Sequence, residues 1–116
     1  DRNNITYVPL DLYKTTWNFD RQDVVFIDAM HTYDTCNMDI HNSLNLLPVG
    51  GYLVFDDFSN PGDKYGVRRS VNDYIEKGII TAELFIGEED TSNFFTHAHE
   101  ATKEGMTPEG IICKKN

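Results

Sequence analysis

Cysteine is scarce in this sequence of 116 residues, which contains only Cys36 and Cys113. The two lie far apart and form no CxxC pair. This excludes a disulfide framework and a cysteine-based zinc site of the usual spacing. We therefore expect two reduced thiols in the core of a cytoplasmic protein.

Long apolar runs and positive charge are also lacking. No apolar stretch approaches the roughly 18 residues that a membrane span needs, and no basic-then-apolar signal segment opens the chain. Nineteen acidic and ten basic residues give a net charge of -9. Such a charge repels phosphate backbones and anionic lipids, so we expect neither a nucleic-acid nor a membrane partner. The same charge is compatible with cation binding.

Enough apolar matter is present for one packed core, because hydrophobic residues make up 40% of the chain. The length predicts a single domain over residues 1–116. Four consecutive apolar residues at 24–27 indicate a strand buried on both faces, as in a parallel sheet. The patterns predict strands at residues 5–10, 23–28, 52–55, 80–86 and 110–114, and helices at 32–47 and 67–79.

This order of elements predicts an α/β fold with an open, mostly parallel sheet and flanking helices. Thr32 or Asp34 is the expected cap of the first helix. No strong helix pattern separates the last two strands, so we expect them to form an antiparallel pair.

Carboxylates follow two neighbouring strands of the predicted sheet. Asp28 ends one strand, and Asp56 and Asp57 end the next. The carboxyl ends of adjacent parallel strands lie at one edge of a sheet, so the three side chains should converge there. Such an oxygen-rich set suits a hard cation such as Mg²⁺, Mn²⁺ or Ca²⁺. The alternative is that these acids are helix caps and turn residues.

Histidines offer a general base as well. His31 follows Asp28 by three residues and should face the same edge, where its near-neutral pKa suits proton transfer. The alternative is that His31 lies at the helix start and only forms hydrogen bonds with backbone groups there. Tyr33 is interpreted as a packing residue at the helix start, with a hydroxyl that faces the site as the alternative. His41 is interpreted as a solvated residue. The pair His97 and His99 lies in a segment, 87–109, for which the sequence predicts no fold.

Residues 23–57, DVVFIDAMHTYDTCNMDIHNSLNLLPVGGYLVFDD, resemble the later half of class I S-adenosylmethionine-dependent methyltransferases. The likeness is closest to the small-molecule O-methyltransferase group with the pattern IDxxHxY…D…L…GGxxxxDD, which includes macrolide-sugar O-methyltransferases and cephalosporin-hydroxylase-like proteins. The segment 66–71 is similar to the GVxxAV helix start of that group. The resemblance spans roughly residues 5–86 and implies a Rossmann-like methyltransferase half-fold.

The resemblance also implies roles for individual residues. Asp28, Asp56 and Asp57 would bind Mg²⁺ or Mn²⁺, and His31 would take a proton from the substrate hydroxyl. Asp11 would lie near the adenine of S-adenosylmethionine. The implied reaction is metal-assisted methyl transfer to a small-molecule hydroxyl.

One part of the family pattern is missing from the sequence. The family needs a glycine-rich turn after its first strand, and no such turn follows a predicted strand here. The pair Gly50 and Gly51 precedes a strand instead. We therefore expect the half of the fold that binds the cofactor to be absent. The chain alone is then expected to be incomplete or inactive. The alternatives are a non-catalytic binding or assembly module and a metal-dependent sugar-nucleotide transferase.

The missing half would also expose the apolar edge of the strand at 23–28, a feature that proteins normally cover. We expect this edge to be covered either by the strand at 5–10 or by the same edge of a second chain, which would form a homodimer.

Overall fold

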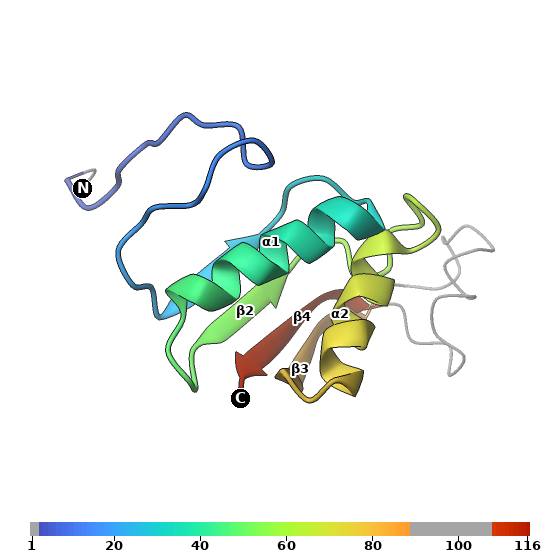
Figure 1. Ribbon diagram of the computed structural model, residues 1–116. Helices are drawn as coiled ribbons and strands as arrows, with labels where there is room; N and C mark the ends of the chain where they lie inside the picture. Colours follow the sequence, from blue (N-terminus) through green and yellow to red (C-terminus); the bar gives the residue numbers. More distant parts are fainter. Residues whose placement is uncertain (1–2, 89–107) are drawn as a thin grey trace.

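A computed structural model describes residues 3–88 and 108–116 of the chain (Figure 1). Its described elements are β1 (Val24–Ile27), α1 (Tyr33–Leu46), β2 (Tyr52–Phe55), α2 (Gly66–Glu76), β3 (Ile80–Glu88) and β4 (Pro108–Lys115). The strands form one sheet in the order β1-β2-β4-β3. β1 and β2 are parallel, and β4 runs antiparallel to both β2 and β3. The predicted α/β sheet with an antiparallel last strand is confirmed.

Helix α1 begins where the sequence predicts. Thr32 is its N-cap, and its Oγ1 accepts a hydrogen bond of 3.2 Å from the backbone N–H of Thr35. Asp34 lies in the first turn instead of at the cap, where its charge complements the helix dipole. Among the described residues, no helix combines the length and apolar character that crossing a membrane requires.

The core lies between the two helices and one face of the sheet. Leu53 and Phe55 of β2 are buried there, together with Ile111 and Cys113 of β4. Both cysteines are free and buried, as the sequence predicts. Burial raises the pKa of the Cys36 thiol to about 11, so at neutral pH it is protonated and packs as an apolar side chain.

The opposite face of the sheet is exposed at β1, so the prediction that the strand at 23–28 is buried on both faces is wrong. The side chains of Val24 and Phe26 are 53% and 60% exposed, whereas Ile27 is buried. Both helices cover the same face of the sheet (Figure 1). No described element covers the other face, so β1 is buried on one side only.

Residues 5–10 do not form the predicted strand, which is a second correction. They run as an irregular segment beside the sheet, and β1 pairs only with β2 within the described part of the chain. The segment leaves a groove of about 660 Å³ along the free edge of β1, lined by residues that include Asn4, Val8, Trp17, Phe19, Val24 and Phe26. The edge is therefore flanked by the N-terminal segment but not paired by it.

Candidate functional site

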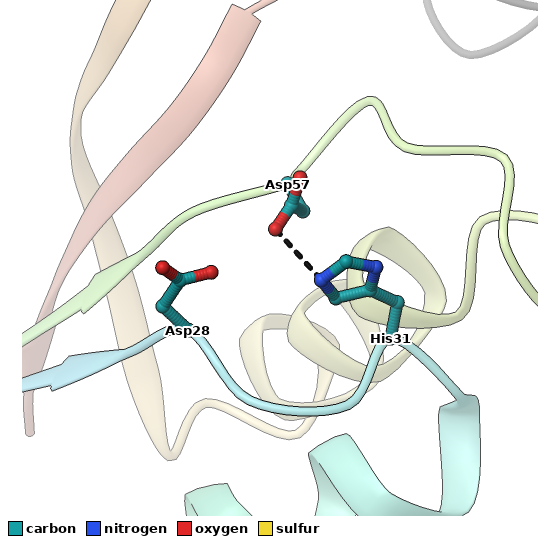
Figure 2. Close-up of side chains that lie close together, drawn as sticks. All are labelled: Asp28, His31 and Asp57. Carbon is teal, nitrogen blue, oxygen red and sulfur yellow. Dashed lines mark ion pairs between the residues drawn. The ribbon is translucent and has the colours of Figure 1, made fainter.

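Two of the predicted acids meet the predicted histidine at the edge of the sheet where β1 and β2 end. Asp28 directly follows β1, Asp57 follows β2 by two residues, and His31 lies in the loop between β1 and α1. The parallel register pairs Ile27 with Phe55, which brings both strand ends to the same level. Figure 2 shows the three side chains pointing toward one another, and one ligand atom of each lies within 4.8 Å of the others.

His31 and Asp57 form a close polar contact at the centre of this group, which is an ion pair only when the imidazole is protonated. Nε2 of His31 lies 2.8 Å from Oδ2 of Asp57, and both side chains are partly buried. An ionised carboxylate can only accept a hydrogen bond, so Nε2 carries the hydrogen and donates it. The lone pair of a neutral imidazole then resides on Nδ1.

The surroundings of Asp57 concentrate negative charge. Burial is the main cause that raises the pKa of its carboxyl, and the charge of Asp56 adds to this effect, while His31 opposes it. The backbone N–H of Asp57 also donates to Oδ1 of Asp56 at 2.8 Å, with Asp57 in the left-handed region at φ 60°. A bound cation would stabilise the ionised form of this carboxyl.

Asp56 belongs to a neighbouring group instead of the one around His31. Its carboxylate lies near those of Asp57 and Glu109, again with one oxygen of each within 4.8 Å of the others. Asp57 is thus shared by two groups. Sequence reasoning missed Glu109, because strand β4 brings it to this edge from the far end of the chain.

The loop that carries His31 is packed tightly against the start of α2. A Cβ on Gly66 would lie 2.5 Å from the Tyr33 nitrogen and closer still to the His31 carbonyl oxygen. Oδ2 of Asp63 accepts a hydrogen bond of 2.7 Å from the Tyr33 N–H. The Tyr33 hydroxyl donates to Asp73 of α2. Tyr33 therefore joins the two helices, in keeping with its interpretation as a packing residue.

The other candidate residues lie outside this group. Asp11 begins a turn, where its Oδ1 accepts a hydrogen bond of 3.0 Å from the Tyr13 N–H, and it pairs with Lys14 at 3.7 Å. His41 is exposed, as predicted. His97 and His99 fall outside the described residues.

Comparisons with known proteins agree with the fold and the motif. Residues 2–58 match a family described as a methyltransferase domain. Among solved structures, the chain is similar to a “putative O-methyltransferase” from Klebsiella pneumoniae, with 18% identity and a TM-score of 0.53. The alignment covers 90% of this chain but 44% of that one, so the chain spans less than half the length of this structural relative. A comparison with curated proteins found no match.

Proposed function

We propose that this chain, which carries part of a class I methyltransferase domain, contributes the cation-binding and general-base side of an O-methyltransferase site. The methyl donor is S-adenosylmethionine, and the acceptor is the hydroxyl of a small molecule. The observation that carries this proposal is the convergence of Asp28, His31 and Asp57 at the edge of two parallel strands.

His31 acts as the base in this proposal. Asp57 accepts the Nε2–H and so orients the imidazole, and it stabilises the imidazolium that forms when Nδ1 takes the hydroxyl proton. Among the described residues, no hydrogen bond to Nδ1 competes for that lone pair. Removing the proton makes the oxygen a better nucleophile toward a sulfonium methyl group.

The carboxylates of Asp28 and Asp57 would hold Mg²⁺ or Mn²⁺, with Asp56 and Glu109 adjacent. Oxygen ligands fit such a cation, as does the proximity of Asp56 and Asp57, whose charges repel each other. When bound, a divalent cation lowers the pKa of a hydroxyl and fixes its direction.

In this proposal, the site for S-adenosylmethionine needs residues besides Asp28, His31 and Asp57. No glycine-rich turn follows β1 or β2, because Gly50 and Gly51 precede β2. A contact between Asp11 and the adenine stays a prediction. We therefore propose that this chain supplies the cation ligands and the general base of the reaction site. Further residues would supply the cofactor site.

Mn²⁺ binding, followed by electron paramagnetic resonance, tests the proposed site. We expect Asp57→Asn to weaken binding at least about tenfold, because it removes both a ligand and a negative charge. Asp20→Asn is the matched control, since it makes the same change at an exposed acid outside both carboxylate groups. Equal affinities for the parent chain and Asp57→Asn would overturn the proposed cation site.

His31→Ala separates the two roles open to the imidazole in the same titration. If His31 is a base, the variant keeps the affinity of the parent within about twofold. A loss as large as that of Asp57→Asn would make His31 a ligand and remove it as the base.

A further inference from the structure

Tyr13 connects three parts of the molecule that lie apart in the sequence. Its hydroxyl donates to Oδ2 of Asp39 at 3.2 Å and accepts from the backbone N–H of Met30 at 3.4 Å. Tyr13 lies in the N-terminal segment, Asp39 in α1, and Met30 in the loop between β1 and α1. A single hydroxyl thus bridges a helix and the loop that carries His31.

The direction of these hydrogen bonds follows from the chemistry of Asp39. This side chain is 1% exposed, and its ionised carboxylate can only accept. The hydroxyl of Tyr13 must therefore give its proton to Asp39, which leaves its lone pairs for the Met30 N–H. Helix α1 holds Asp39 at a fixed place, so the hydroxyl is held at a fixed place as well.

Met30 is the residue directly before His31, and its backbone N–H is tied to the N-terminal segment. The N–H donates to the Tyr13 hydroxyl at 3.4 Å, whereas the carbonyl oxygen lies 3.5 Å from Oγ1 of Thr35, whose single proton has closer partners on Thr32. The hydrogen bond to Tyr13 limits how far the loop can rotate about the peptide that leads into His31. The contact between His31 and Asp57 requires that rotation to be fixed.

The turn at residues 11–17 presents Tyr13 in the required orientation. Oδ1 of Asp11 accepts from the Tyr13 N–H at 3.0 Å, and Nε1 of Trp17 donates to the Leu12 carbonyl oxygen at 3.0 Å. Side chains on both flanks thus stabilise the backbone around Tyr13. Asp11 thus contributes one hydrogen bond to this turn.

We infer that Tyr13 is a positioning residue for the site: its hydroxyl, held by the buried Asp39, fixes the loop that carries Asp28 and His31. The role of the loop in catalysis rests on the proposed function. The hydrogen bonds that join Tyr13 to Asp39 and Met30 do not depend on that function. Removing the hydroxyl should loosen the loop at Met30 and weaken cation binding at Asp28 without unfolding the sheet.

Amide hydrogen exchange of the metal-free chain, measured by NMR, tests the link directly. In Tyr13→Phe, the Met30 amide should exchange about three to ten times faster, as expected for the loss of one hydrogen bond. Amides in β2 should keep the exchange rates of the parent. Tyr7→Phe is the matched control, because Tyr7 lies in the same segment and is 93% exposed. An unchanged Met30 exchange rate in Tyr13→Phe would overturn the inference.

Mn²⁺ affinity of the same variants tests the consequence for the site. We expect Tyr13→Phe to bind Mn²⁺ several-fold more weakly than Tyr7→Phe. Faster Met30 exchange with unchanged affinity would overturn the positioning role, because the link would then not reach the site. If the parent chain does not bind Mn²⁺, the proposed function fails, and the Met30 exchange rate alone decides the inference.

Discussion

At the scale of single residues, Asp39 gives the chain a measurable response to pH. Burial raises the pKa of its carboxyl from 3.8 to about 6, and the hydrogen bond from Tyr13 opposes this shift. Because the pKa is higher in the folded chain, folding takes up a proton. The contribution of Asp39 to stability is therefore complete below about pH 4 and is lost as the pH rises through 6.

Asp39→Asn removes this titration while it keeps an oxygen to accept from Tyr13. Between pH 5 and 8, Asp39 should lower the free energy of unfolding of the parent by about 1–2 kcal/mol, a change that the variant lacks. Urea denaturation across this range measures the difference. Asp34→Asn, an exposed acid in the same helix, should follow the parent. Parallel curves for the parent and Asp39→Asn would contradict the assignment.

The sequence predicts the positions of the site residues at the strand ends better than it predicts the hydrogen bonds that support them. Asp28, His31 and Asp57 could be placed together because parallel strands align their carboxyl ends. The bond between Tyr13 and Asp39 spans 26 residues, and no local pattern predicts it. A signal was nevertheless present, because Asp39 lies on the buried stripe of α1 beside Cys36, Ile40 and Ser43.

At the scale of elements, the approach of α2 to the loop at residues 31–33 sets the shape of the site. Three consecutive residues, Asp63, Lys64 and Tyr65, adopt positive φ values of 49°, 47° and 62° just before α2. Arg69 donates to the carbonyl oxygens of Asp63 and Lys64 and lies over the ring of Tyr33, 4.6 Å from its centroid. The sequence predicts the helix but not this strained entry.

Gly66→Ala tests whether that approach matters to the site. The new Cβ would meet backbone atoms of His31 and Tyr33, so the loop must move, at a cost of about 1–3 kcal/mol in stability. We expect weaker Mn²⁺ binding together with a lower melting temperature.

Gly78→Ala is the control, because Gly78 has a positive φ of 73° but open space around its Cβ position. It should lose about 1 kcal/mol of stability through backbone strain and leave Mn²⁺ affinity unchanged. Normal Mn²⁺ affinity in Gly66→Ala would contradict the importance of this contact.

Two errors about strands have physical causes at this scale. The segment at 5–10 has β-rich composition, but propensity alone does not make a strand, and the segment lies along the free edge of β1 without pairing to it. Tyr7 in this segment is almost fully exposed. The run at 24–27 is apolar throughout, so its sequence cannot show that one face is open.

At the scale of the whole molecule, a large part of the apolar surface of the sheet is exposed. One face of the sheet and the edge of β1 expose large side chains such as Val24, Phe26 and Leu84. The solved relative is more than twice as long as the aligned part of this chain. Pairing of the β1 edge with a second copy stays a prediction.

The central claim is that Asp28 and Asp57 hold a divalent cation beside His31. The most direct test is a titration of the isotope-labelled chain with Mn²⁺, in which the paramagnetic ion broadens the NMR signals of nearby amides. If the cation binds there, the amides of residues 28–31 and 56–58 broaden first, at a small fraction of one equivalent. Broadening that begins elsewhere, or that is uniform over the chain, would contradict the claim.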